Sequence, residues 1–146
     1  ATGINRPEGG RRTAPTAKNW QEVDVYISTK QGIYVYDPKA NALIPVVSGD
    51  LRSQTYTQQV FKDAPVNLVF ISDLARMGDG DDATKTVLTG MDTGYVSQNV
   101  YLYCAAAGLN TGYRVTLDKE KLGKTLKLKP TQKIMGAQSI GLPKKK

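Results

Sequence analysis

One short polar stretch, Arg11–Gln21, holds the residue types best suited to binding a ligand. It reads Arg-Arg-Thr-Ala-Pro-Thr-Ala-Lys-Asn-Trp-Gln, and it combines hydrogen-bond donors and acceptors with a proline that restricts the backbone. The stretch shows no apolar periodicity, which is typical of an irregular surface segment, and such segments often carry binding groups. Judged by residue type alone, Trp20 suits a core anchor and a ligand contact equally well.

Several other chemistries are excluded by residue type. The sequence contains no histidine, the most common metal ligand and general base. Ser139 lies in Gly136–Gly141, which superficially resembles a nucleophile elbow, but a hydrolase triad needs a base, so we interpret Ser139 as a strand residue. Cys104 is the only cysteine, which excludes an internal disulfide and a cysteine cluster for metal.

Two further motifs fail on spacing. The acidic loop Asp73–Asp82 lacks the alternating oxygen ligands and the final glutamate of an EF-hand, so we expect no metal site there. The glycines near the N-terminus and those of Gly108–Gly112 lack the order and the preceding strand of a dinucleotide-binding fingerprint. The sequence therefore predicts neither a calcium loop nor a Rossmann domain.

The positive charge of the chain is concentrated near its C-terminus. There are 20 Lys and Arg residues against 13 Asp and Glu, a net charge of +7, so a polyanion or a phosphate-bearing ligand is a reasonable partner. For the tail Lys144–Lys146 we favour a solvated end over a specific phosphate contact, which stays open as the alternative. Nucleic-acid binding is not favoured, because the tyrosines mostly occupy strand positions instead of alternating with basic residues.

Length and composition fit one domain over residues 1–146, with an irregular binding loop over 1–21, a sheet and helices over 22–143, and a basic tail over 144–146. No apolar run approaches the roughly 20 residues of a membrane-spanning helix, which predicts a soluble protein. The chain starts without a methionine or a signal peptide, so we expect that an upstream segment was removed. A cytoplasmic location is the default expectation, and an extracytoplasmic one follows if that segment carried a signal.

Residue patterns predict an α+β fold with a mixed, mainly antiparallel sheet and one long helix packed on it. Strands are expected at Val23–Ser28, Gly32–Asp37, Leu43–Val47, Val66–Ile71, Tyr113–Leu117 and Ile134–Ile140, and helices at Leu51–Gln59, Ala83–Ala107 and Asp118–Leu128. The long helix has apolar residues at helical spacing (Val87, Met91, Tyr95, Val100 and Cys104). Its Gly90 and Gly94 predict close packing against a neighbour.

Four segments in the same order resemble the FMN-dependent nitroreductase family. Ala14–Gln21 is similar to its Pro-Ser-Ala-x-Asn-x-Gln stretch with one Ser-to-Thr change, and Lys62–Val69 is similar to its Ala-Pro strand. Asp92–Asn99 resembles its central helix, and Gly108–Thr111 resembles its Gly-Leu-Gly-Thr loop. The C-terminal stretches Leu126–Pro130 and Gln138–Pro143 continue the resemblance, which spans most of the chain.

The resemblance implies a homodimer that binds FMN at the interface between its subunits. One subunit would contribute the FMN-binding residues Arg12, Pro15, Thr16, Ala17, Asn19 and Gln21, and the other the main chain around Gly112, Tyr113, Arg114 and Val115, close to flavin N5. Such a site needs flat apolar walls and a few fixed donors, and it needs no histidine. Arg114 and Val115 depart from the family's usual residues, so substrate preference is not carried over.

The resemblance also implies that the family's N-terminal helices and arginine-rich phosphate motif lie upstream of this chain. We therefore expect an N-terminally truncated nitroreductase-like fold, with Lys145 as a substitute phosphate contact and an oligomer that buries apolar surface.

Two functional hypotheses follow. The first is an NAD(P)H oxidoreductase that transfers hydride in two steps to a nitroaromatic, a quinone or a similar small organic acceptor, with no catalytic side chain, because flavin N5 carries the chemistry. The second is a non-catalytic basic binding protein that keeps the fold but has lost tight FMN binding. The compartment, the acceptor and the choice between NADH and NADPH stay open.

Overall fold

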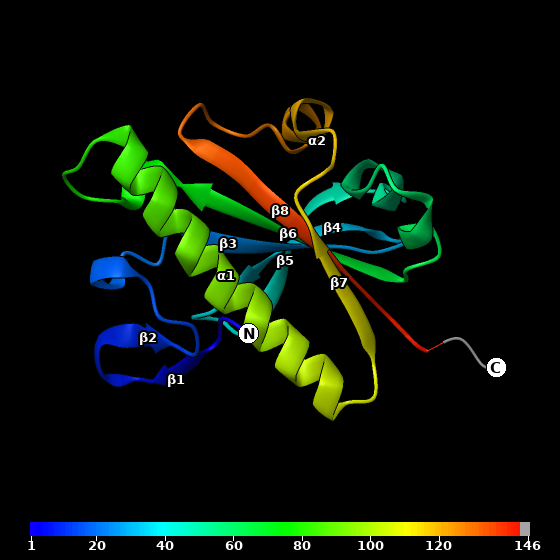
Figure 1. Ribbon diagram of the computed structural model, residues 1–146, viewed down its shortest axis with the longest axis horizontal. Helices are drawn as coiled ribbons and strands as arrows, with labels where there is room; N and C mark the ends of the chain where they lie inside the picture. The colour runs from blue at the N-terminus through cyan, green and yellow to red at the C-terminus, as the bar shows by residue number, and fades with distance from the viewer. Residues whose placement is uncertain (144–146) are drawn as a thin grey trace.

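The computed structural model describes residues 1–143 and is built on a six-stranded antiparallel sheet (Figure 1). The strand order is β5-β4-β3-β6-β8-β7. The strands are β3 (Val23–Ser28), β4 (Gly32–Asp37), β5 (Ala42–Ser48), β6 (Val66–Asp73), β7 (Asn110–Arg114) and β8 (Gln132–Gly141). The predicted α+β fold with a mainly antiparallel sheet is confirmed, and the first three of these strands form an antiparallel meander.

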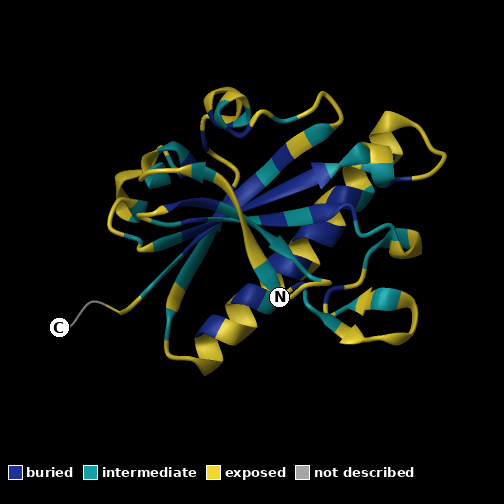
Figure 2. Ribbon diagram, turned by 180° about the vertical axis from the view of Figure 1, so that it is seen from behind, coloured by how far each residue is buried: buried dark blue, intermediate teal, exposed yellow. Residues whose placement is uncertain are grey.

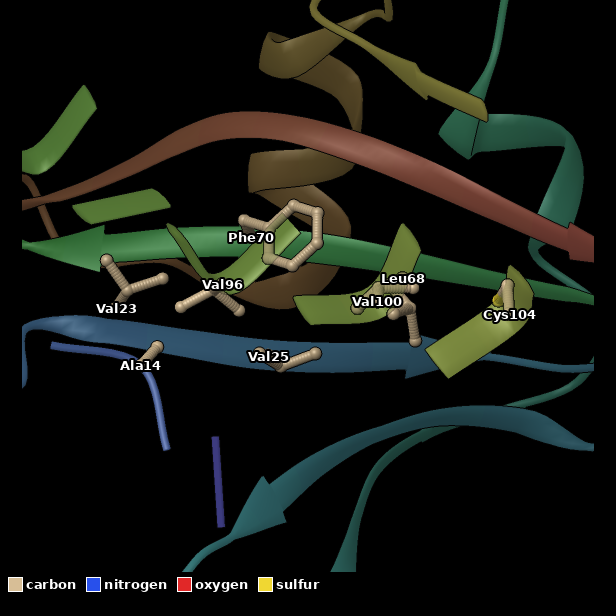
Figure 3. Packing of buried hydrophobic residues seen from close by; sticks show 8 residues of the cluster. All are labelled: Ala14, Val23, Val25, Leu68, Phe70, Val96, Val100 and Cys104. Carbon is tan, nitrogen blue, oxygen red and sulfur yellow. The ribbon is translucent and has the colours of Figure 1, made fainter. Parts of the chain in front are cut away.

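Two helices cover opposite faces of the sheet. The long helix α1 (Asp82–Ala106) packs on the face of β6 that carries Leu68 and Phe70, as Figure 3 shows. The short helix α2 (Lys119–Leu126) packs on the other face, where Leu122 and Leu126 meet Val69 and Ile71. Side chains along a strand alternate between faces, so the apolar run of β6 supplies both cores.

Helix α1 begins one residue before its predicted start, and its N-cap is Asp81, whose side chain accepts a hydrogen bond from the Thr84 amide. One side of α1 is buried against the sheet and the other is exposed (Figure 2). Gly90 and Gly94 lie on the exposed side, and nothing in residues 1–143 comes within 4 Å of a β-carbon built on either. The close packing predicted at these glycines is therefore wrong within the chain.

Three local predictions were wrong. The segment 51–59 forms no continuous helix, only separate 3-10 turns at Arg52–Thr55 and Gln59–Phe61. Strand β7 begins at Asn110 and not at Tyr113, so residues read as a loop belong to the sheet. The segment 1–21 is not wholly irregular, because β1 (Ile4–Arg6) and β2 (Arg11–Arg12) form a small antiparallel hairpin. Further 3-10 turns span Glu8–Gly10, Ala17–Asn19 and Leu74–Arg76.

None of the helices in the described part of the chain has the length and hydropathy needed to cross a bilayer.

Candidate functional site

The polar loop between β2 and β3 has an unusual backbone. Lys18, Asn19 and Gln21 all have positive φ, at 48°, 57° and 53°. Non-glycine residues rarely occupy this region, because the β-carbon crowds the backbone there, and such strain persists only where surrounding contacts hold it. Residues of this kind gather at ligand sites, so the loop is a strong candidate for binding.

Hydrogen bonds hold the loop in this shape. The Gln21 amide donates to Thr16 Oγ1 at 2.9 Å, and Gln21 Nε2 donates to the Gly10 carbonyl and to Asn19 Oδ1, each at 2.9 Å. The Ala17 amide donates to Asp92 Oδ2 at 2.9 Å and so joins the loop to α1. The loop is therefore fixed both to the β1–β2 hairpin and to the long helix.

The loop residues predicted to bind the flavin differ in accessibility. Pro15 and Asn19 are exposed, whereas Thr16, Ala17 and Gln21 are partly buried. Arg12 is turned towards β3, where its Nη1 donates to the Val23 carbonyl at 3.1 Å, and burial lowers the pKa of its guanidinium. The loop thus presents Pro15 and Asn19 outward and uses Arg12 for its own anchoring.

Trp20 lies on the loop and belongs to neither hydrophobic core. Its ring is partly exposed, and Lys18 Nζ lies 5.3 Å from the ring centroid. A tryptophan that anchored the core would be more deeply buried. The geometry therefore favours a role for Trp20 at the loop surface.

The second predicted segment, Gly112–Val115, lies at the edge of the sheet. The Tyr113 amide donates to the hydroxyl of Tyr101 on α1 at 2.8 Å, so it faces away from β8. Along a strand, successive amides point alternately towards one neighbour and away from it. The Thr111 amide therefore points away from β8, like that of Tyr113. The Gly112 and Arg114 amides point towards β8. Val115, just beyond the strand, is exposed.

Arg114 extends its side chain into the interior of the fold. Its Nε and Nη2 donate to the Thr55 carbonyl at 3.0 and 2.7 Å, Nη1 donates to Ser139 Oγ at 2.8 Å, and Nη2 also reaches Asn67 Oδ1 at 3.1 Å. The guanidinium carbon lies 4.2 Å from the centroid of the Phe61 ring. Burial lowers the pKa of Arg114 to about 10. Its side chain fastens the 52–61 segment to the sheet and does not face a ligand.

A hollow of about 550 Å³ adjoins this segment. Its walls come from the 60–65 segment, from the first half of β7 and from the end of β8, including Phe61, Gly112 and Leu142. A β-carbon at Gly112 would lie 3.1 Å from Phe61, so glycine permits the close approach of these walls. The hollow has the size of a small-molecule site.

The two predicted flavin-binding segments lie apart within one chain. The loop contacts α1 at Asp92, whereas β7 contacts it at Tyr101, nine positions further on. Nine residues of α-helix rise about 14 Å. Figure 1 shows the same separation, with the polar loop beside the first half of α1 and β7 beside the second. The hollow beside Phe61 is lined by β7 and by no residue of the polar loop, so it does not join the two segments within one chain.

Two buried acidic residues, Glu22 and Asp92, were not among the predicted site residues. Asp92 was predicted only as part of the segment that resembles the family's central helix, yet the side chains of Glu22 and Asp92 adjoin beneath the loop. The sequence offered one indication of this arrangement: Asp92 lies on the same face of the helix as the apolar residues Val96 and Val100. Lys145, the predicted phosphate contact, lies outside the described residues.

Within residues 1–143 no group of three or more metal-ligating side chains comes together.

The antiparallel sheet under a long helix is the nitroreductase-like fold. The chain belongs to the Nitroreductase family, whose model matches residues 3–142. A curated relative from Methanocaldococcus jannaschii, named as a nitroreductase, is 27% identical over 116 residues, which cover 71% of this chain and 58% of the relative.

Solved structures agree with this assignment. A protein of Ralstonia eutropha JMP134 described as a nitroreductase matches with a TM-score of 0.93 and 33% identity, covering 99% of this chain and 69% of that one. A chain of the Escherichia coli microcin synthetase complex McbBCD matches with a TM-score of 0.82 at 18% identity, covering 99% of this chain and 60% of that one, and this likeness concerns the fold alone. The chain thus spans about three fifths to two thirds of the length of these relatives.

Proposed function

We propose that this chain forms part of an FMN-dependent NAD(P)H oxidoreductase that reduces a small organic acceptor. Family membership supports a flavin oxidoreductase in general. The observation that carries the proposal is the strained, hydrogen-bonded loop at 14–21, which matches the family's flavin stretch and is fixed to α1 by the bond from Ala17 to Asp92. When bound, FMN supplies hydride acceptance and donation at N5, so the protein needs no acid or base of its own.

The loop residues fit a flat heterocycle. Pro15 offers an exposed apolar surface, and Asn19 is exposed with its amide nitrogen donating to nothing within residues 1–143. Because Asn19 Oδ1 accepts from Gln21, the orientation of the amide is set, and its nitrogen is free to donate to a ring carbonyl. Thr16 and Ala17 support this surface from beneath, and Lys145 is proposed for the phosphate.

The wall of the flavin site opposite the polar loop is assigned to a second copy of the chain. On β7, the outward amide of Thr111 and the exposed main chain near Val115 would supply donors to the partner's flavin, while the Tyr113 amide is already bound by Tyr101. The hydride donor NAD(P)H and the organic acceptor would occupy the same open face of the flavin one after the other, as two-step transfer requires. The hollow beside Phe61 would receive them.

A homodimer follows from the exposed side of α1. Val87, Met91, Tyr95 and Leu102 are 62%, 56%, 48% and 60% exposed and lie on one side of the helix, together with the two uncovered glycines. Apolar patches of this kind mark interfaces between proteins. Met91→Glu should convert the protein to a monomer in light scattering, whereas Thr86→Glu, on a neighbouring exposed position of α1, should not. A dimer that survives Met91→Glu would contradict this interface.

The cofactor proposal is tested by absorption spectroscopy. Purified protein is mixed with FMN, desalted and scanned, and we expect the flavin spectrum to remain with the protein and NAD(P)H to be consumed when a quinone or nitroaromatic is added. Asn19→Ala should weaken FMN binding by about tenfold, the value of one good hydrogen bond. Asn99→Ala, which removes only a contact to the Ala1 carbonyl, is the control. Equal affinity in all three proteins would refute the assignment of Asn19.

One observation favours the alternative, a basic binding protein without flavin. Lys119, Lys124, Lys127, Lys129 and Lys133 line a hollow of about 610 Å³ between α2 and β8, with Glu120 as its acidic member. Such a site suits a polyanion. Salt-sensitive binding of nucleic acid by a protein that retains no flavin would favour this alternative over the oxidoreductase.

A further inference from the structure

A buried carboxyl group lies directly beneath the polar loop. Glu22 joins the loop to β3, and its side chain is fully buried. Neither of its carboxyl oxygens has a hydrogen-bond partner of good geometry in residues 1–143. Thr89 on α1 lies close enough to act on the carboxyl group, but its hydroxyl donates to Ser72 Oγ. An ionised carboxylate in such a place is costly, since burial removes the water that solvates it and no donor replaces that water.

The side chain next to this carboxyl group is a second one. Asp92 on α1 adjoins Glu22 and is only 3% exposed. Asp92 Oδ2 accepts the hydrogen bond from the Ala17 amide, the contact that fixes the loop to the helix. Two carboxyl groups in contact cannot hydrogen-bond to each other unless one of them carries a proton.

The charged groups around the pair do not provide this missing donor. Arg76, from the turn after β6, donates to Asp24 and to the main-chain carbonyls of Gln21 and Glu22. Arg12, from β2, donates to the Val23 carbonyl, although its charge acts on Glu22 through space. Each arginine has one buried Nε without a partner in residues 1–143, but the hydrogen bonds that the two make go to main chain or to Asp24. Asp92 is therefore the ionisable neighbour of the Glu22 carboxyl group.

We propose that Glu22 and Asp92 share one proton, and that this protonated pair positions the loop for the flavin. Glu22 carries the proton and donates a hydrogen bond through it to Asp92, and Asp92 also accepts the hydrogen bond from the Ala17 amide. Both are positioning residues, since they act on the flavin through the loop backbone. The proposal rests on the flavin site proposed above, but the proton itself belongs to the protein and is measurable without flavin.

The sign of the pH dependence follows from the arrangement. Burial raises the pKa of Glu22 above its ordinary value, and the neighbouring Asp92 raises it further. The folded state thus holds a proton that the unfolded state releases, so the pair stabilises the loop at low pH and loses this effect as the pH rises through the folded pKa. Above that pKa two buried carboxylates repel each other, and the hydrogen bond that the Ala17 amide donates to Asp92 weakens.

Trp20, the only tryptophan in the chain, reports on the loop and makes the test direct. Its fluorescence is measured in flavin-free protein from pH 5 to pH 9, and the Kd for FMN is measured over the same range. We expect a single fluorescence transition and, above it, a rise in Kd of about tenfold per pH unit. Glu22→Gln keeps a donor towards Asp92 without a titrating proton, so both pH dependences should disappear while FMN affinity at low pH is retained.

Two variants separate this role from simple loss of fold. Asp92→Asn presents donors to an ionised Glu22 and keeps an oxygen for Ala17, so it should rescue FMN binding at high pH, whereas Asp92→Ala should weaken it at every pH. Glu120→Gln, an exposed carboxyl paired with Lys124, should leave both profiles unchanged.

The outcomes distinguish the two proposals. A Trp20 transition that Glu22→Gln abolishes supports the shared proton even if FMN does not bind, in which case only the proposed flavin site fails. The shared proton is refuted if Glu22→Gln keeps the same transition as the natural sequence, or if the natural sequence shows no transition between pH 5 and pH 9.

Discussion

Replacing Arg114 by methionine should remove most of what holds the 52–61 segment against the sheet. Methionine keeps the apolar stem of the side chain but ends near the position of Nε, so it removes all four hydrogen bonds and the cation beside the Phe61 ring. Ser139 and Asn67 stay bonded to each other, so they lose little. The Thr55 carbonyl is the group left without its donors, and Thr55 is fully buried.

The expected loss in the free energy of unfolding comes mainly from the Thr55 carbonyl. A buried unsatisfied carbonyl costs about 1–3 kcal/mol, and the lost interaction of the cation with the Phe61 ring adds about 1 kcal/mol. Part of the loss is offset, because the guanidinium no longer has to be desolvated, the effect that lowers the pKa of Arg114 to about 10. We expect a net destabilisation of about 2–3 kcal/mol, which lowers the urea midpoint by about 1–2 M.

Urea denaturation followed by Trp20 fluorescence measures this change, and limited trypsin digestion adds a local readout, because Lys62 directly follows the segment that should loosen. Arg6→Met is the matched control, since Arg6 is exposed and its replacement should change stability by less than about 0.5 kcal/mol. Arg114→Lys should fall between the two, because an ammonium cannot reproduce the forked contacts. A loss below about 1 kcal/mol for Arg114→Met, with unchanged digestion at Lys62, would refute the clamping role.

Two glycine substitutions should change stability in opposite directions, and a labelling experiment tests the burial of the cysteine. Gly136→Ala should destabilise the fold by about 2 kcal/mol or more in the same urea assay, because the added β-carbon would lie 2.7 Å from the Arg114 carbonyl, a backbone atom that cannot move aside. Gly123→Ala should stabilise it by about 0.5–1 kcal/mol, since the site lies inside α2 with only Leu128 at 3.9 Å. The Cys104 thiol is fully buried and burial raises its pKa, so a thiol reagent should label it slowly at pH 8 and rapidly in urea. Rapid labelling of folded protein would contradict this burial.

The elements that sequence patterns predicted best are those whose burial is regular. β3 and β4 have the bounds expected from their β-branched and aromatic residues, and α1 is shifted by a single residue. The strand predicted at Val66–Ile71 is β6, which lies between β3 and β8 with Val69, Phe70 and Ile71 fully buried. Local pattern sufficed here because each residue type matches the environment that the sheet provides.

Prediction failed where a distant contact decides the local structure. Thr55 has its carbonyl bound by Arg114, 59 positions away, so the 51–59 segment is held as turns despite its helical pattern. Strand β7 starts with Asn110 and Gly112, residues that favour turns, and its pairing with β8 overrides that preference. The loop shape depends in the same way on Asp92, which is 75 positions from Ala17.

Helix α1 was read correctly in extent but its exposed side was not foreseen, because Val87, Met91 and Tyr95 had the spacing of a core stripe. The structure buries Val96, Val100 and Cys104 together with polar residues and leaves that stripe in solvent. The buried polar groups find partners inside the chain: Thr89 with Ser72, Ser97 with Gln138, and Asp92 with Ala17.

This distribution departs from that of the usual amphipathic helix, in which apolar groups face inward and polar groups face water. In α1, polar residues share the buried side with Val96, Val100 and Cys104. Exposed apolar side chains contribute nothing to the stability of the isolated chain, whereas each becomes favourable once a second apolar surface covers it. The same helix carries Asp92 beneath one half of the proposed flavin site and Tyr101 against the other half, about 14 Å apart. Covering α1 with a second copy would therefore bury the stripe and supply the missing half of the site in one step, which is why cofactor binding and dimer formation are expected to be lost together in Met91→Glu.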